Sequence, residues 1–222
     1  MQNTTDYNSI IEKAIEEIES KNFGTTEQLL TIHEVVYENN RPKVLIVDFE
    51  KSDGTVIVYF GIKNEKFHLA LWLDTLPEIS IRAVGTEPFS RVYLEARSES
   101  LSYQEISTLI NIQPSSGWSK GDVKSYGNSC YEFSAVRFEL EQEPDEFEDK
   151  LEKLLDLLET DKGGIAALVK ESTAFIRTIL VFHNGNTMLG GFCLTKKTVK
   201  RLAALDIEID FDLYAEGNLY DE

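Results

Sequence analysis

Residues 43–74 read KVLIVDFEKSDGTVIVYFGIKNEKFHLALWLD, and their pattern predicts the fold of the first part of the chain. It holds three runs rich in β-branched, aromatic and other apolar residues, with Asp53-Gly54 and Asn64-Glu65 between them. Runs of this kind predict strands, and such dipeptides between them predict tight hairpin turns. A further strand-like run, TIHEVVYE, precedes them. We therefore expect a four-stranded antiparallel meander, with strands at residues 31–38, 43–50, 55–62 and 66–74.

The segment before this meander predicts a helix over residues 5–20. Its apolar residues recur at the spacing of one helical face, and Lys21 and Gly24 suit a helix C-terminus. One helix and one meander together make a small α+β module, for which we expect the range 1–76. The sequence TLPE at 75–78 is a plausible junction to a second domain at 77–222.

The second part alternates between strand-like and helix-like segments, which predicts an α+β sandwich related to ferredoxin-like folds. Its first helix has a clear start, because Ser102 can cap it and Glu105 can complete a capping box. A loop containing GWSKGD (117–122) follows that helix. The expected strands are 79–84, 91–98, 131–140, 174–183, 189–194 and 206–214, and the expected helices are 102–111, 144–160, 163–171 and 196–205.

The composition indicates a globular protein with a strong acidic excess. The chain has 222 residues, 10% aromatic residues and a net charge of −17. Such a charge repels nucleic acid phosphates and anionic membranes, and it attracts basic partners. The N-terminus lacks the basic start and apolar run of a signal peptide, and Cys130 and Cys193 suggest no disulfide framework. We expect a cytoplasmic protein with reduced thiols.

No motif of an enzyme is present in the sequence. His33, His68 and His183 fall in or at the ends of strand patterns, where histidines usually serve as packing or rim residues. The chain has no Gly-x-Ser-x-Gly elbow, no Cys-x-x-Cys, no His-x-x-x-His and no phosphate-binding glycine loop. We therefore predict no catalytic residues, no metal and no cofactor, although an enzyme without a recognisable motif stays possible.

Trp118 stands in a polar loop and has two interpretations. An exposed Trp can contact a partner, since aromatic residues are enriched in binding hot spots. It can equally fold back onto the sheet, with its indole N–H bonded to a carbonyl oxygen. We favour the anchor and treat a contact with a partner as secondary.

The acidic residues of the predicted helix at 144–160 form a single stripe opposite its leucines. Like charges at four-residue spacing repel, so folding alone does not require such a stripe. A solvated face is its ordinary explanation, and a docking surface for a basic protein is the alternative. The stripe consists of Asp145, Asp149, Glu152, Asp156 and Glu159.

The last predicted strand, DIEIDFDLY, alternates in the same way. Glu208, Asp210 and Asp212 point away from the apolar side, and carboxylates two residues apart repel each other. Basic residues on a neighbouring strand would make this row structural. Two of the carboxylates could instead hold Mg²⁺ or Ca²⁺, but no cation-binding loop is present. The remaining interpretation is again a surface that binds a basic partner.

Several short motifs of the second part occur in a familiar order. They are INIQP at 110–114, Lys120-Gly121-Asp122, GGF at 190–192, and a helix that leads to Asp212-Leu-Tyr214. In these motifs and their order, residues 80–216 resemble a bacterial domain-of-unknown-function family, number 4279, and residues 1–76 fall outside the resemblance. The family commonly has a Trp in the strand after the loop, where this chain has Tyr131 and Phe133. The resemblance implies a shared fold and no particular chemistry.

These observations favour an acidic binding protein over an enzyme. The most concrete hypothesis is an immunity or antitoxin-type inhibitor that binds and neutralises a basic bacterial toxin, for example a nuclease. The acidic stripe and the acidic row of the last strand would then contact the partner. One alternative is a small-molecule or metal-dependent enzyme or a ligand sensor, with a pocket in which Trp118 and Tyr131 converge. Another is a structural subunit with no separate activity.

Overall fold

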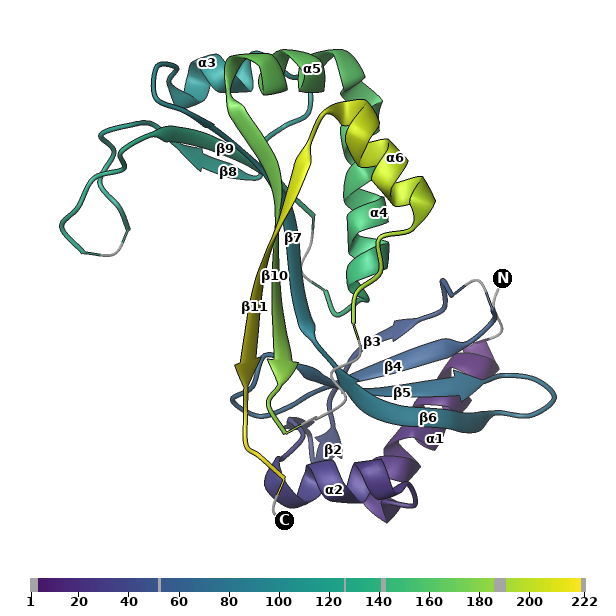
Figure 1. Ribbon diagram of the computed structural model, residues 1–222. Helices are drawn as coiled ribbons and strands as arrows, with labels where there is room; N and C mark the ends of the chain where they lie inside the picture. Colours follow the sequence, from purple (N-terminus) through teal and green to yellow (C-terminus); the bar gives the residue numbers. More distant parts are fainter. Residues whose placement is uncertain (1–3, 52, 126, 141–142, 186–190, 221–222) are drawn as a thin grey trace.

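The computed structural model describes residues 4–51, 53–125, 127–140, 143–185 and 191–220. Two sheets lie at an angle to each other, each with its own helices (Figure 1). No helix in these residues is long and apolar enough to cross a membrane. The elements of the first part are α1 (Thr4–Ser20), α2 (Gly24–Ile32), β1 (Tyr37–Glu38), β2 (Arg41–Pro42), β3 (Val44–Asp48), β4 (Val56–Gly61), β5 (His68–Asp74) and β6 (Ser80–Glu87).

The predicted four-stranded antiparallel meander is present, with the strand order β3-β4-β5-β6. Alternate side chains of β4 and β5, such as Val58 and Leu71, pack against α1 and α2. Its fourth strand is β6, which we had expected to open the second part. The prediction of a continuous strand at 31–38 was wrong. The helix α2 extends to Ile32, Val35 forms an isolated bridge with Ile62, and Tyr37–Glu38 pair as a short strand with β2.

The reason for this difference is a polar contact that the strand pattern does not show. Glu17 on α1 is buried, and its carboxylate accepts hydrogen bonds from the backbone N–H of Phe23 (2.9 Å) and from the hydroxyl of Thr26 (2.6 Å). These bonds hold the turn after α1 and satisfy donors at the start of α2. Leu29 then packs into the core from α2, so the helix rather than a strand covers the sheet.

The second part is a five-stranded mixed sheet with the order β11-β10-β7-β9-β8, in which only β10 and β11 are parallel. The α+β class is therefore confirmed for both parts. The elements are β7 (Phe89–Ser98), α3 (Tyr103–Ser107), β8 (Ser116–Trp118), β9 (Ser134–Glu139), α4 (Phe147–Leu158), the 3₁₀ turn η1 (Glu159–Asp161), α5 (Lys162–Glu171), β10 (Thr173–His183), α6 (Lys196–Leu205) and β11 (Glu208–Glu216).

The four helices of this part cover one face of its sheet (Figure 1). The predicted capping box is present at α3, where Ser102 and Glu105 bond each other's backbone N–H. Leucines of α4 such as Leu154 pack against Leu94 of β7 and Ile176 of β10 to form the core. None of the helices in the described residues covers the opposite face of the sheet.

The prediction of a strand at 189–194 was wrong for residues 191–194, the part of this range that the structure describes. Residues 189–190 lie outside the described residues, and residues 191–194 form no strand. The physical reason is that β10 has no free edge. It pairs with β7 on one side and with β11 on the other, so a hairpin partner after residue 185 finds both edges occupied.

The chain passes from the first sheet to the second at Pro88, between β6 and β7. Behind this crossing the two parts share a buried contact. The Nε2 atoms of His33 and His183 lie 3.1 Å apart, and Nε2 of His183 is 2.9 Å from the carbonyl oxygen of Asn218. Both histidines are buried packing residues, as expected, although His33 follows α2 and only His183 lies in a strand. An ion pair between Lys66 and Glu216 (2.8 Å) closes the same junction at the surface.

Candidate functional site

The uncovered face of the second sheet, which we call the open face, concentrates arginine and aromatic side chains. Alternation places one set of each strand's side chains on this face, while Val92, Leu94 and Ala96 point into the core. The register sets the residues of β7, β9, β10 and β11 beside one another across the strands. The open face carries Arg91, Tyr93, Glu95, Arg97, Arg137, Phe175, Arg177, Glu208, Asp210 and Asp212.

Glu95 is the centre of the open face. Its side chain is only 1% exposed, and it accepts one hydrogen bond from each of two arginines. Nε of Arg97 donates to Oε1 at 2.5 Å, and Nε of Arg137, directly opposite on β9, donates to Oε2. One carboxylate therefore holds two guanidinium groups. The terminal Nη nitrogens of both arginines have no partner among the described residues.

Two aromatic rings lie against each of these guanidinium groups. The Arg97 guanidinium carbon lies 4.8 Å from the ring centroid of Phe133 and 4.9 Å from that of Phe175. The Arg137 guanidinium carbon lies 5.0 Å from the ring of Tyr93 and 4.8 Å from that of Trp118. Such cation–π contacts fix the guanidinium planes, because the rings occupy the space into which the side chains would otherwise rotate.

Trp118 ends the short edge strand β8 rather than standing in a free loop. Its indole Nε1 donates to the carbonyl oxygen of Phe133 at 2.9 Å, and its ring stacks on that of Tyr131 with centroids 4.4 Å apart. Gly117 lets the strand approach α3 closely, since a Cβ there would lie 2.4 Å from the ring of Tyr103. This is the geometry of an anchor, and it also places the indole beside Arg137.

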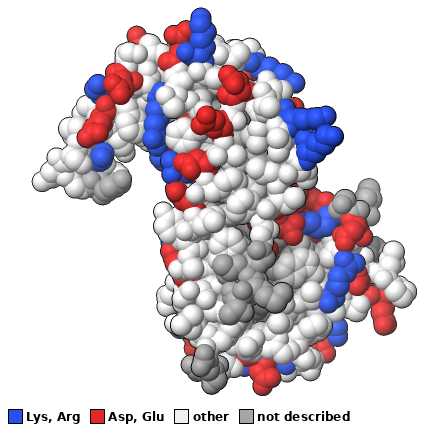
Figure 2. Space-filling model, in the orientation of Figure 1, with Lys and Arg blue, Asp and Glu red and all other residues white. Residues whose placement is uncertain are grey.

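A shallow hollow of about 480 Å³ opens beside these residues. Figure 2 shows it as a notch between the body and the protruding β8–β9 hairpin, with basic side chains along the body. Lys124 adds a third positive charge, with Nζ 5.6 Å from the ring centroid of Tyr131. The hollow is lined by Glu95, Arg97, Trp118, Lys124, Ser125, Tyr131, Glu132, Phe133 and Arg137.

A family model matches residues 87–216, which is more than half of the chain and contains the whole open face. The model describes a domain of unknown function, DUF4279. The chain belongs to the DUF4279 family. No curated protein and no solved structure matches the chain. The match begins beside Pro88, where the chain changes sheet, and the first module lies outside it.

The acidic row of the last DUF4279 strand meets a basic residue on the neighbouring strand. Asp210 and Asp212 of β11 bind Arg177 of β10, at 3.1 Å and 2.6 Å. Ile209 and Phe211 pack into the core, which confirms the predicted alternation. Glu208 is exposed. Two of the three candidate carboxylates are thus held by one guanidinium group of the same sheet.

The acidic stripe of α4 is also bound within the DUF4279 domain along its C-terminal half. Arg201 of α6 donates from Nε to Glu159 (2.7 Å), from Nη1 to Glu152 (2.6 Å) and from Nη2 to Asp156 (2.6 Å). Lys197 adds a bond to Glu152 at 3.0 Å. The hydrogen bond to Arg201 holds the pKa of Glu159 below its usual value. The stripe therefore fastens α6 to α4.

The N-terminal end of the stripe binds the first module. Lys51, in the turn after β3, is 11% exposed and contacts Asp145, Glu146, Asp149 and the nearby Asp48. Burial opposes its charge, but the hydrogen bonds that its ammonium donates to these carboxylates raise the pKa of Lys51 above its usual value. Oxygens of three of these carboxylates lie within 4.8 Å of one another, and the Lys51 ammonium is their counter-ion.

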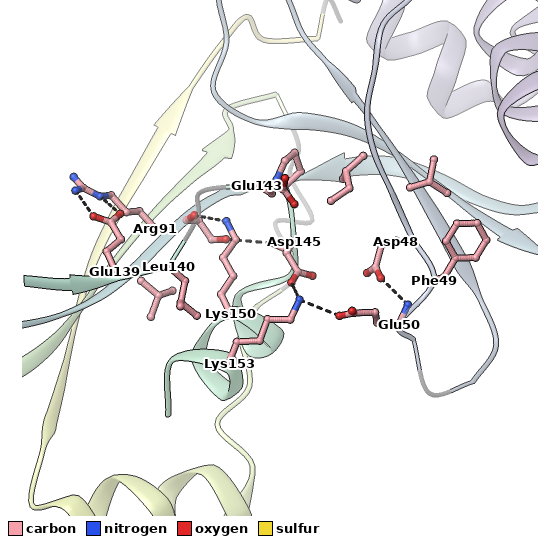
Figure 3. Close-up of a pocket in the computed structure, with 15 residues that line it drawn as sticks. Asp48, Phe49, Glu50, Arg91, Glu139, Leu140, Glu143, Asp145, Lys150 and Lys153 are labelled. Carbon is pink, nitrogen blue, oxygen red and sulfur yellow. Dashed lines mark hydrogen bonds and ion pairs between the residues drawn. The ribbon is translucent and has the colours of Figure 1, made fainter. Parts of the chain in front are cut away.

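A second cavity, of about 680 Å³, lies between the first module and the DUF4279 domain (Figure 3). Figure 3 shows paired charges at both of its ends: Arg91 binds Glu139, and Lys153 bridges Asp145 and Glu50. Between them, Nζ of Lys150 donates to the carbonyl oxygen of Ser90 at 2.7 Å. Burial lowers the pKa of Lys150 to about 8. Apolar residues of β3 and β7, among them Ile46 and Val92, form the walls.

The candidate residues named from the sequence therefore do not form one surface. Those of α4 face α6 and the first module, those of β11 lie on the open face, and Trp118 lies at the edge of that face. The arginines were missed. A signal for them exists in RVYLEARS, where Arg91, Tyr93, Glu95 and Arg97 alternate with apolar residues and so must share one face.

Proposed function

We propose that this protein is a non-catalytic binding protein of the immunity type, which captures a basic bacterial toxin on the open face of its DUF4279 sheet. The observation that carries the proposal is the cluster of Arg97, Arg137 and their four flanking aromatic rings, on a sheet face that no helix of the described residues covers. Arginine, tryptophan and tyrosine are the residues most enriched in the hot spots of protein–protein interfaces.

The form of this face also favours a protein over a small molecule as the partner. The hollow beside Trp118 is shallow and lies on a broad surface, whereas small ligands are usually enclosed by deep pockets. Positive and negative side chains alternate across the face, because Arg177 stands between Glu95 and the acidic row of β11. Such a mixed pattern suits a partner with complementary charges and rejects one with a different arrangement.

The acidic excess of the whole molecule supports a basic partner. A net charge of −17 accelerates the approach of a positively charged protein, and this effect weakens as salt screens the field. The carboxylates of the α4 stripe contribute to this long-range field even though Lys51 and Arg201 bind them. In this proposal they attract the toxin, and the open face holds it.

The test combines capture with neutralisation. Wild-type protein and the variants Trp118→Ala and Tyr37→Ala are immobilised in native lysate at low salt, and bound proteins are released by raising the salt. Tyr37 is an exposed aromatic residue of the first module and serves as the matched control. We expect wild type and Tyr37→Ala to retain a basic protein that stops growth when expressed alone, and Trp118→Ala to lose it.

Co-expression then decides the function. Growth should be restored when the captured protein is expressed together with wild type or Tyr37→Ala, and it should not be restored with Trp118→Ala. Circular dichroism must show that Trp118→Ala is folded. Capture of the same proteins by all three forms, or growth arrest that wild type does not relieve, would contradict the proposal.

The cavity between the two parts supports a second candidate function, a sensor of a small ligand. Cavities at domain junctions commonly bind small molecules, and Lys150 lines this cavity as a partly buried ammonium with a lowered pKa. A screen of metabolites by thermal shift, with Lys150→Met as the comparison, tests this function. A ligand that stabilises wild type but not Lys150→Met would establish it, and no stabilising ligand would argue against it.

A further inference from the structure

We propose that Arg97 and Arg137 form a binding site for a carboxylate, and that the protein partner supplies this carboxylate from an Asp or Glu side chain. Only the choice of a protein as the source rests on the proposed function. The site itself rests on the geometry around Glu95.

The two guanidinium groups line the same hollow. Each uses its Nε to donate a hydrogen bond to the same buried carboxylate of Glu95, so the Nη ends take no part in that bond. Those ends have no partner among the described residues, and the side chains of Arg97 and Arg137 are 36% and 25% exposed. An incoming carboxylate can therefore accept hydrogen bonds from the Nη groups without breaking an existing bond.

The site is held in shape before any ligand binds. Phe133 and Phe175 flank Arg97, and Tyr93 and Trp118 flank Arg137, so both guanidinium planes are fixed from two sides. Long, flexible arginine side chains normally lose conformational entropy on binding. Here folding has already restricted them, and this lowers the entropic cost of binding a carboxylate.

The charge of the hollow selects a singly charged group. Its lining has three basic residues, Arg97, Arg137 and Lys124, and two acidic residues, Glu95 and Glu132, so one positive charge is in excess. One carboxylate neutralises it. A phosphate dianion would leave a negative charge in the hollow of a protein whose net charge is already −17. The site therefore takes carboxylates in preference to phosphate.

The direct test uses peptides and simple anions at constant ionic strength. The probes are an eight-residue Gly/Ser peptide with capped ends and a single central Glu, the same peptide with Gln, sodium acetate and inorganic phosphate. Binding is read from Trp118 fluorescence in a Trp72→Phe background, because the chain has two tryptophans. NMR of the arginine side-chain N–H groups gives a second readout at the guanidinium groups themselves.

We expect the Glu peptide to bind roughly tenfold more tightly than the Gln peptide, and acetate to compete better than phosphate. Arg137→Gln and Arg97→Gln should each abolish the difference between the peptides. Arg137→Lys should retain only part of it, because Lys keeps the charge but lacks the planar fork. Arg41→Gln, an exposed arginine of the first module, is the matched control and should behave as wild type.

The possible outcomes test three claims separately: that the site binds a carboxylate, that a protein supplies this carboxylate, and that the protein has an immunity function. Equal binding of the Glu and Gln peptides, or stronger competition by phosphate, would overturn the carboxylate site. Acetate binding as tight as the Glu peptide would overturn the choice of a protein as the source. A confirmed carboxylate preference in a protein that neutralises no toxin would leave the site standing and reject the immunity function alone.

Discussion

Arg201 and Glu95 each hold together a cluster of ion pairs, but the ratio of charges in the two clusters is opposite. At Arg201 one guanidinium group binds three carboxylates and uses Nε, Nη1 and Nη2 to do so. At Glu95 one carboxylate binds two guanidinium groups and leaves their outer ends unused. The first cluster fastens two helices, and the second leaves hydrogen-bond donors on the surface.

This difference shows that the number of charged residues in a stretch of sequence does not indicate where a partner binds. The α4 stripe is the most acidic feature of the chain, yet Lys51, Lys153, Lys197 and Arg201 bind its carboxylates. The arginines of the open face are spread over β7, β9 and β10, but the Nη donors of Arg97 and Arg137 have no hydrogen-bond partner among the described residues. Binding capacity follows from the donors and acceptors that folding leaves without a partner.

The largest effect is expected where the stripe joins the first module. Lys51→Met removes the counter-ion of four carboxylates, two of which, Asp48 and Asp145, are largely buried, and it should lower the free energy of unfolding by about 3 kcal/mol. Urea unfolding at pH 7 measures this change. Lys63→Met, which removes an exposed ion pair with Glu34, should leave stability unchanged. Equal effects of the two variants would show that the ion pairs of the stripe contribute no more to stability than ordinary surface ion pairs.

A smaller loss is expected at the centre of the open face. Glu95→Gln leaves two guanidinium groups facing each other with no carboxylate between them, and it should cost about 2 kcal/mol. Urea unfolding in low and high salt provides the measurement, since added salt screens the new repulsion and should recover part of the loss. A variant as stable as wild type would show that the aromatic rings alone position the arginines.

Glu87 differs from the carboxylates of both clusters, because it has no ion-pair partner among the described residues. Burial raises the pKa of Glu87 to about 8, well above the value near 4.5 of an exposed Glu. The folded state thus binds a proton that the unfolded state lacks between these pH values, so stability of wild type falls as pH rises through this range.

Glu87→Gln removes this proton uptake. Relative to wild type the variant should gain stability between pH 5 and pH 8, by up to about 1.4 kcal/mol for each pH unit, as measured by urea unfolding at several pH values. Glu27→Gln on α2, an exposed position, serves as the control and should show no pH-dependent gain. A difference between Glu87→Gln and wild type that stays constant with pH would rule out a protonated Glu87.

The smallest effect on stability is expected at the edge of the open face. Trp118→Ala removes the stacking on Tyr131, the contact with Arg137 and the hydrogen bond to Phe133, at a half-buried site. We expect a loss of about 1 kcal/mol by thermal unfolding. Unchanged stability together with lost partner binding would assign Trp118 to recognition alone.

Local patterns in the sequence predicted much of the fold because the structure follows them. The capping box at Ser102, the leucine face of α4 and the alternation at Ile209 and Phe211 are all present. The failures arose where a distant contact decides. Glu17 fixes the start of α2, and the pairing of β10 on both edges leaves no room for a hairpin at 189–194.

The candidate site was harder to predict because four strands, β7, β8, β9 and β10, contribute its side chains. Arg97, Arg137 and Phe175 are far apart in the chain, and only the strand order β10-β7-β9 brings them together. A sequence pattern can place Arg97 and Glu95 on one face of a strand. It cannot state which strands lie on either side, and therefore it cannot show that Arg137 shares the carboxylate of Glu95.

The acidic row of β11 has a further consequence for the behaviour of the protein at high concentration. β11 is a nine-residue strand at the edge of its sheet, and such an edge can pair with the edge of another molecule and start aggregation. Glu208, Asp210 and Asp212 line this edge, and no Lys or Arg follows Asp206. Two copies brought edge to edge would oppose carboxylates with carboxylates. This repulsion makes edge-to-edge pairing of two β11 strands less favourable.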